Sequence, residues 1–420
     1  MKILKAIFGD KSLRGRILFV IGILILTRII AAIPIPAVGT SSLSSYFQMQ
    51  TTGVLGLLNI FSGGGLSTLS IAMLGVGPYI TASIIMQLMT VLSPRLKEMN
   101  QEEGEKGRRK FVQYGRLMTF PFALLQGSGL LALLSKQNFI EPLTRESFAL
   151  NLIVITAGSL LLMWLGEKIN ERGIGNGVSL IIFAGIVAAL PQTIARSLVT
   201  FDVSQIPVLL ALIAISLISI YFIVFITEAE RPIEVTYAKQ SHTASAGFGY
   251  NTYIPLRLNQ AGVVPIIFAI SILLFPQLIS QLLAKHGGIG SEIATSVNAF
   301  LSNHLAYGIT YFLLVFIFTY FYTAIIFEPE KTAENLQKNS AFIPGFRPGK
   351  ATSDYIEKVL TRITLVGALF LGGVAVLPYI VQSITGFTSI AIGGTSLLIA
   401  ISVVLDLIKK VDAQVTMREY

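Results

Sequence analysis

The chain has 420 residues, of which 53% are hydrophobic and only 13% are charged, and its formal net charge at pH 7 is +9. This balance excludes an intrinsically disordered chain and an ordinary globular enzyme. The absence of cysteine excludes disulfides, thiolate metal sites and cysteine nucleophiles. The three histidines, His242, His286 and His304, fall in predicted loops and lack a second ligand type at metal-binding spacing. We therefore predict no metal site and no cofactor.

Ten apolar stretches of about twenty residues, almost free of charge, follow one another along the chain. Backbone amides in lipid must be hydrogen-bonded within a helix or a closed barrel, and these stretches do not alternate apolar with polar residues. We therefore predict an all-α polytopic membrane protein with ten transmembrane helices. The predicted spans are 17–33, 71–92, 117–134, 148–165, 178–195, 207–226, 262–283, 305–327, 359–381 and 390–408.

Lysine and arginine are distributed very unevenly between the connecting segments. With the N-terminus in the cytosol, 26 of the 31 fall in or beside the two tails and the loops after the second, fourth, sixth and eighth spans. Only four, Lys136, Arg145, Arg196 and Lys285, lie on the opposite side, and Arg28 lies within the first span. By the positive-inside rule, both termini are predicted to be cytosolic.

Five spans precede Thr200 and five follow it. An odd number of spans in each half would insert a repeated half upside down relative to its partner. Counting therefore predicts two inverted five-helix halves, residues 1–200 and 201–420, with a functional path at their interface. The sequence shows no clear residue-level repeat between them.

Two glycine-rich stretches interrupt the pattern of plain spans. Residues 53–66 are apolar but too short to cross a membrane, and both a half-helix tucked into a cavity and a simple outer-face loop fit them. Residues 171–177 open the fifth span. No Lys-Ser/Thr follows that stretch and no strand precedes it, so we interpret it as a flexible turn rather than a phosphate cradle.

The predicted helix centres hold almost no ionisable groups. Arg28, Glu228 and Asp406 lie toward span ends, and Glu167 lies at a cytosolic end beside Trp164. Ion-coupled permeases need intramembrane charges, and hydrolases need an acid pair, a Ser-His set or a metal cluster. We therefore predict no enzyme activity and disfavour ion-coupled transport. The remaining interior polar residues are uncharged, and one such group per helix often only bonds a neighbouring helix: Gln87, Gln126, Asn259 and Gln260.

Seven runs along the chain carry a family pattern. They are FSGGGL at 61–66, GPYITASIIMQL at 77–88, GEKGRRK at 104–110, MWLGEKINERGIGNG at 163–177, NQAGVVP at 259–265, AFIPGFRPG at 341–349 and GGTSLLI at 393–399. In order and spacing they resemble the SecY family, the pore-forming subunits of the bacterial Sec protein translocon. The resemblance extends over nearly the whole chain and implies two five-helix halves around a central hourglass pore.

The resemblance also implies a constriction ring of branched aliphatic residues. Val76 with Ile80, and Val178 with Ile182, are each four residues apart and so share a helix face. Such side chains can close on a passing polypeptide without hydrogen-bonding it, and they dewet the gap so that ions do not leak. For each residue taken alone, lipid-facing or core packing is the alternative. The predicted pore ring is Val76, Ile80, Val178, Ile182, Ile267 and Ile399.

A plug and a lateral gate follow from the same resemblance. The plug would be a short segment that packs under the ring and swings away during transport. Gln87, with Asn259 as its neighbour near the seventh helix, would line a gate between the second and seventh helices that releases hydrophobic segments into lipid. The predicted plug residues are Leu57, Leu58, Asn59, Phe61, Ser62, Gly63, Gly64, Gly65 and Leu66.

The resemblance further implies the partners. The 6/7 loop at about 227–260 and the 8/9 loop at about 328–358 would dock the ribosome or the ATPase SecA, through Lys239 and Arg347. The alternative is that these charges only set topology. Pro232, in the unusually acidic run 230–234, puts docking through the tip of the 6/7 loop in doubt. SecE as a clamp, SecG, signal-peptide-bearing polypeptides and membrane lipids complete the implied partners, with no nucleic acid substrate.

The predicted function is a passive protein-conducting channel in the plasma (inner) membrane. It would translocate unfolded secretory polypeptides and release membrane-protein helices laterally. The alternative is an ion-independent permease for small solutes, and the missing interior charge is a feature that discriminates between the two.

Overall fold

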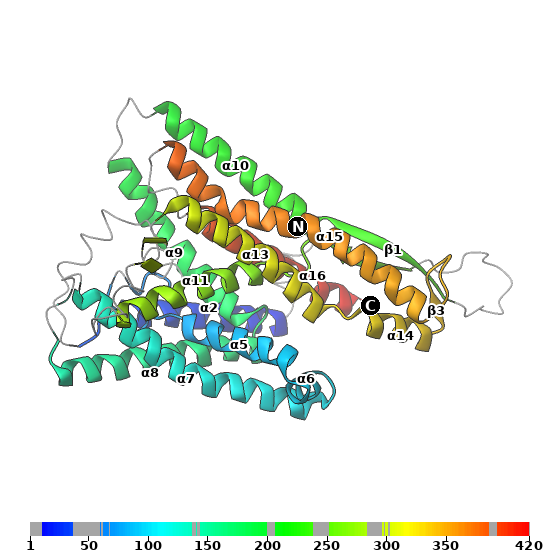
Figure 1. The fold of residues 1–420 in the computed structure, drawn as a ribbon, viewed down its shortest axis with the longest axis horizontal. Coiled ribbons are helices and arrows are strands. Elements are labelled where there is room, and N and C mark those ends of the chain that lie inside the picture. The colour runs from blue at the N-terminus through cyan, green and yellow to red at the C-terminus, as the bar shows by residue number, and fades with distance from the viewer. Residues whose placement is uncertain are drawn as a thin grey trace.

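The computed structural model describes most of the chain, and Figure 1 shows how its elements are arranged. The described residues are 11–36, 59, 62–66, 68–136, 140, 143–199, 206–237, 252–283, 296–297, 299–300, 303–385 and 393–419.

Ten long helices occupy the ten predicted spans. They are α2 (Lys11–Ala32), α5 (Gly77–Leu92), α7 (Gly104–Lys136), α8 (Arg145–Arg172), α9 (Gly177–Val199), α10 (Ile206–Glu228), α11 (Val264–Leu283), α13 (His304–Ile326), α15 (Lys350–Thr385) and α16 (Gly393–Glu419). Within the described chain, five of them, α2, α7, α8, α13 and α15, are long and apolar enough on their own to cross a membrane. His304, predicted in a loop, is the first residue of α13.

Several helices continue beyond the apolar spans. α7 begins at Gly104 rather than near 117, and α15 begins at Lys350 rather than near 359. The apolar window marks only the part of a helix that lies in lipid, whereas charged residues such as Glu and Lys also favour helix in water. Two short helices, α6 (Pro94–Gln101) and α14 (Pro329–Lys338), extend the polar end further. Each has proline in its first turn, where the missing N–H costs nothing.

The two sets of five helices repeat the same pattern of neighbours. In the first set, α2 contacts α8 and α9, α5 contacts α7 and α8, and α8 contacts α7 and α9. In the second set, α10 contacts α15 and α16, α11 contacts α13 and α15, and α15 contacts α13 and α16. Each pair in the first set thus has its counterpart in the second. The sets meet where α11 lies against α5 and α7, and where α16 lies against α9.

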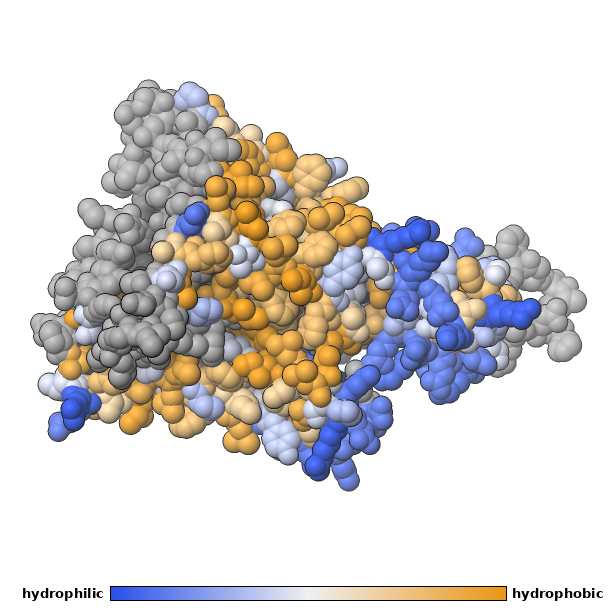
Figure 2. All heavy atoms as spheres, viewed as in Figure 1, coloured by the Kyte–Doolittle hydropathy of each residue, from blue (hydrophilic) through white to orange (hydrophobic). Residues whose placement is uncertain are grey.

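The described ends of the chain lie together at the polar end of the molecule. Leu13 near the start of α2 and Val411 near the end of α16 are buried in one cluster with Ile174, which lies in the turn between α8 and α9. Lys409 also forms an ion pair of 2.8 Å with Glu228 at the end of α10. In Figure 2 a broad hydrophobic region covers the middle of the molecule, and hydrophilic residues gather at the end that carries α6, α14 and β1 in Figure 1.

A small sheet at this end departs from the all-helical prediction. β1 (Glu230–Tyr237) pairs antiparallel with β2 (Thr252–Arg257), and on its other edge with β3 (Ala341–Phe342) from the segment between α14 and α15. Ile233 and Val235 are buried between exposed neighbours, as expected for a half-buried strand. The sheet joins the 6/7 and 8/9 loops, so these loops are held together.

Close helix contacts in the first half depend on glycine. A Cβ at Gly177 would lie 1.9 Å from the carbonyl oxygen of Gly166, and one at Gly158 would lie 2.0 Å from that of Ile71. No side chain can occupy such a space, so α8 would have to move away from α9 and from the segment before α5.

We expect Gly177→Ala to lower the free energy of unfolding of the detergent-solubilised protein by about 2–3 kcal/mol, because overpacking forces the backbones apart. Thermal unfolding followed by the fluorescence of the single tryptophan, Trp164 on α8, measures this. Gly22→Ala on α2 is the control, because its Cβ would meet nothing within 4 Å. Equal unfolding midpoints for the two variants would contradict the close approach of α8 to α9.

Candidate functional site

The six predicted ring residues all belong to, or pack against, one large hydrophobic cluster that draws residues from both sets of helices. Val76, Ile80, Ile182, Ile267 and Ile399 are buried members of one hydrophobic cluster, and Val178 is partly buried and packs against it. Val76 is the N-cap of α5 rather than a residue within the helix, and its carbonyl accepts the backbone N–H of Ile80 at 3.1 Å. This bond keeps the two side chains on one face.

The ring residues come from both sets of helices. α5 and α9 belong to the first set, and α11 and α16 to the second. The contacts of α11 with α5 and of α16 with α9 bring these helices together across the boundary. Branched aliphatic side chains offer no hydrogen-bonding group to water or to a peptide. Such a junction stays dry when it is packed and can part without breaking any polar interaction.

Residues 62–66 of the predicted plug form turns, not a helix. Asn59 is helical, but residues 62–66 form turns in which Gly63 and Gly64 have φ of +66° and +86°. These left-handed conformations end a helix, so a half-helix does not extend to Leu66. Ser62 and Leu66 are buried, and Gly65 lies beside Ser70. Leu57, Leu58 and Phe61 lie outside the described residues.

Arg28 holds this turn against α2. Its guanidinium Nη1 donates a hydrogen bond to the carbonyl oxygen of Gly63, although the sequence suggested only a charge near a span end. Thr68 adds a second link, because its hydroxyl donates to the carbonyl of Ala31 at 2.9 Å. The backbone N–H of Ile35 donates to the carbonyl of Leu69 at 2.8 Å. The segment after the turn is thus fastened to the end of α2 by side-chain and backbone hydrogen bonds.

The two predicted gate residues have unsatisfied polar atoms. Asn259 lies just before α11 and is 6% exposed, and neither its Nδ2 nor its Oδ1 has a hydrogen-bond partner within the described chain. The same holds for Oε1 of Gln87 on α5. The structure therefore does not join them to each other. Such orphan groups cost free energy when they are buried.

Another predicted polar residue only joins neighbouring helices. Gln126 on α7 donates from Nε2 to the hydroxyl of Thr81 on α5 at 3.0 Å. Both helices belong to the first half, so this bond stiffens that half and leaves its boundary with the second half untouched.

Of the two predicted docking residues, the structure describes one. Arg347 is exposed between β3 and α15, and its carbonyl accepts the hydroxyl of Thr352 at 2.9 Å. Beside it, the rings of Phe346 and Tyr355 stack with centroids 4.1 Å apart. This stack fixes the base of the 8/9 loop. Lys239 lies outside the described residues.

The first amides of α9, where the turn at 171–177 ends, are occupied by side chains of the protein. The N–H of Gly177 donates to Oδ1 of Asn170 at 2.7 Å, and those of Val178 and Ser179 donate to Oδ1 of Asn176 at 3.2 and 3.4 Å. These asparagines cap α9 in place of an anion, which agrees with the interpretation as a turn. Nearby, Nε of Arg116 on α7 lies 2.7 Å from Oε1 of the mostly buried Glu167 on α8. The sequence patterns did not reveal this pair.

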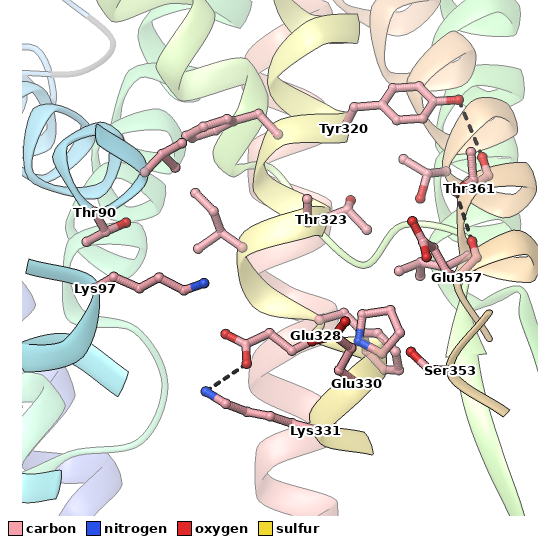
Figure 3. Close-up of a pocket in the computed structure, with 18 of the residues that line it drawn as sticks. Thr90, Lys97, Tyr320, Thr323, Glu328, Glu330, Lys331, Ser353, Glu357 and Thr361 are labelled. Atoms are coloured by element: carbon pink, nitrogen blue, oxygen red, sulfur yellow. Dashed lines mark hydrogen bonds and ion pairs between the residues drawn. The ribbon is translucent and has the colours of Figure 1, made fainter. Parts of the chain in front are cut away.

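A pocket of about 750 Å³ opens between the α5–α6 corner and the wall formed by α13, α14 and α15 (Figure 3). Thr90 and Lys97 line one side, and Glu328, Glu330 and Glu357 are among the residues of the other. The pocket lies at the polar end of the boundary between the two sets of helices, and no sequence pattern predicted it.

Comparisons with known proteins agree with this geometry. The model of the SecY family matches residues 70–408, more than half of the chain. The chain belongs to the SecY family. Protein translocase subunit SecY of Escherichia coli (strain K12) is 41% identical, with 98% of this chain and 94% of that protein covered. The Synechocystis subunit of the same name is also 41% identical, with coverages of 97% and 93%.

Solved structures show the same fold. The structure described as a protein conducting channel superposes with a TM-score of 0.64 at 18% sequence identity, and the match covers 95% of this chain and 91% of that one. The canine Sec61 channel of the endoplasmic reticulum, solved in a ribosome–channel complex, gives a TM-score of 0.63 at the same identity and coverage. The predicted fold class, a helical polytopic membrane protein of this channel type, is confirmed.

Membership of the SecY family confirms the predicted function, a protein-conducting channel of the Sec pathway, and gives no support to a small-solute permease. A channel subunit of this kind is a transporter rather than a catalyst. The SecY-family chain is a multi-pass membrane protein, as its ten long helices and apolar belt indicate.

Proposed function

We propose that unfolded polypeptide passes between the two sets of helices, through the aliphatic cluster that holds the six ring residues. The observation that carries this proposal is that side chains from α5, α9, α11 and α16 meet in one buried cluster at the boundary. A path between two bodies can widen by separating them, whereas a path within one body would have to break its core. The repeated neighbour pattern supports the division into residues 1–200 and 201–420.

Hydrophobic segments would leave sideways between α5 and α11. These helices are in contact across the boundary, and Oε1 of Gln87 on α5 and both amide atoms of Asn259, just before α11, lack partners within the described chain. Separation of α5 from α11 would therefore not cost a hydrogen bond at these three atoms. A sufficiently apolar helix gains more by moving into lipid than the closed junction loses, and we propose that this difference drives lateral release.

The turn at 62–66 would form the end of the plug. Its attachment through Arg28 supports a closed resting position, because the Gly63 carbonyl is an acceptor for this partly buried guanidinium. Displacement of the plug would have to break this bond, so the incoming polypeptide must supply the free energy for opening.

The polar end would face the cytosol and bind the partners. Both described chain ends lie at this end, and so does the sheet that joins the 6/7 and 8/9 loops. We place it in the cytosol, with both termini, because it carries most of the lysine and arginine. Arg347 and Lys239 would dock SecA or a ribosome, SecE would clamp the two halves, and SecG would join the complex. The membrane would be the plasma membrane.

Photocrosslinking tests the path. A polypeptide stalled in mid-passage is expected to crosslink to photoreactive amino acids at Val76, Ile182 and Ile267. Ile213 on α10 is the control position, because its side chain is 49% exposed on the outer surface. Strong crosslinks at Ile213 with none at the three ring positions would contradict a path through the cluster.

A further inference from the structure

We propose that Lys97 and Glu328 form an electrostatic latch across the polar end of the boundary between the two halves of the chain. Lys97 lies on α6, in the first half, and Glu328 is the N-cap of α14, in the second. The inference rests on the proposed function, because it names a contact that must break before α5 can separate from α11.

The two side chains face each other across the pocket between the α5–α6 corner and the wall of α13, α14 and α15. Both line this pocket, and Figure 3 shows the Lys97 ammonium and the Glu328 carboxylate directed toward one another from opposite walls. Among the described residues Lys97 forms no ion pair, so the two partners stand apart in the structure. The flexible stem of lysine lets them meet when the walls approach.

The wall that carries Glu328 attracts a cation. Nζ of Lys331 lies 2.7 Å from Oε2 of Glu328, which leaves Oε1 of the same carboxylate for a second ammonium group. Glu330 and Glu357 line the same wall, and within the described chain neither forms an ion pair. Three carboxylates against one ammonium make this wall negative, and Lys97 is the ammonium that the opposite wall supplies.

The surroundings of the pocket strengthen such a pair. The apolar side chains of Val91, Phe321, Phe327 and Leu360 lie among the charged residues of the lining. Apolar walls lower the effective dielectric constant, so two opposite charges attract each other more strongly there than in open water. Because Lys97 is exposed, salt still screens the attraction.

The two walls move with the helices of the proposed lateral exit. α6 contacts both α5 and α7, and α14 contacts α15. Separation of α5 from α11 would therefore carry Lys97 away from Glu328. The latch adds a charge-dependent free energy to the closed state of a boundary whose other contacts, in the buried cluster, are aliphatic.

A distance measurement between two spin labels tests the latch. Because the chain has no cysteine, Leu92→Cys on α5 and Ile326→Cys on α13 provide two unique labelling sites, with side chains 77% and 49% exposed. The labelled channel complex in lipid vesicles is compared with the same complex carrying Lys97→Met. We expect the population at the longer distance to rise by about twofold to fivefold in the variant, the range for one partly exposed ion pair. Added salt should raise the native population toward that of the variant.

Further variants make the test specific to this pair. Glu328→Gln alone should act like Lys97→Met, and the two together should add nothing further, because the latch is already lost. Arg95→Met is the matched control, because Arg95 is exposed on the same helix but lies outside the pocket lining. It should leave the distance distribution at the native one.

An unchanged distribution in Lys97→Met, an equal shift in Arg95→Met, or a shift by Lys97→Met that persists in full beside Glu328→Gln would each overturn the proposal. Labels in the native complex that do not move apart when a stalled polypeptide occupies the channel would instead count against the proposed exit between α5 and α11. The two failures are therefore distinguishable.

Discussion

Arg28→Met is expected to make the resting channel leak ions. The guanidinium donates to the Gly63 carbonyl and fastens the turn at 62–66 to α2. Methionine has a similar length but no donor, so the carbonyl loses its partner and the turn loses its attachment. A hydrogen bond to a charged group contributes about 1.5–3 kcal/mol, which would shift the balance between closed and displaced states by roughly tenfold to a hundredfold. Conductance of planar bilayers that contain the purified channel measures this change.

Two further variants separate the role of this contact from a general effect of charge. Arg16→Met removes an exposed arginine from the same helix and should leave the conductance unchanged. Arg28→Lys keeps the charge but offers a smaller donor, so its leak should fall between those of the native protein and Arg28→Met. A tight seal in Arg28→Met would show that the turn is held by its other contacts, such as the Thr68 hydroxyl on Ala31.

Ile80→Ser combined with Ile267→Ser is expected to increase ion leak by a different route. Both side chains are buried in the cluster at the boundary between the halves. Exchange of two aliphatic side chains for hydroxyls removes about 1.5–3 kcal/mol of burial free energy at each position and gives water a hydrogen-bonding partner there. We expect the resting conductance to rise by about tenfold or more, because a wetted constriction no longer excludes ions.

Ile218→Ser on α10 is the matched control for the ring variant, because its side chain is 56% exposed on the outer surface. It should leave the conductance at the native level. The two leaks also differ in kind, since the Arg28 variant acts on the plug and the double serine variant on the ring. A protein that carries both Arg28→Met and the double serine substitution should leak more than either variant alone. A resting conductance unchanged by the double serine variant would contradict a dry seal.

The membrane-spanning part of the fold was predictable because lipid imposes a simple rule on the sequence. Each crossing needs a long uncharged helix, and the ten apolar stretches coincide with ten long helices. The charge of the loops predicted that the two ends of the chain lie on one side, and the cluster that joins Leu13 to Val411 has this geometry. The polar extensions that begin α7 at Gly104 and α15 at Lys350 were not predicted, because a search for apolar stretches does not detect helices rich in charged residues.

The small sheet was missed for a related reason. Ile233 and Val235 alternate with polar residues in β1, but the stretch is short and contains Pro232, which pairs with Pro255 across the sheet. Proline weakens a strand assignment because it cannot donate to the ladder. The third strand comes from a distant part of the chain, so no local pattern could have revealed it.

The site was predictable only in part. Six ring positions followed from a resemblance to a family, and the structure collects them in one cluster, although spacing alone links only Val76 to Ile80 and Val178 to Ile182. The contact of Arg28 with Gly63 joins residues 35 positions apart through a backbone carbonyl, which has no sequence signature. The pocket combines residues from α5, α6 and α13–α15, which lie far apart in the sequence, so no local pattern could have revealed it.

Transport by purified components tests the central claim most directly. The chain is combined with SecE in sealed vesicles, SecA and ATP are added with a preprotein, and the fraction of preprotein protected from external protease is measured. We predict protection that requires ATP and that disappears when a disulfide loop too bulky for the constriction is placed in the preprotein. Vesicles that protect no preprotein, or that protect the looped and linear forms equally, would contradict a narrow polypeptide path through the aliphatic cluster.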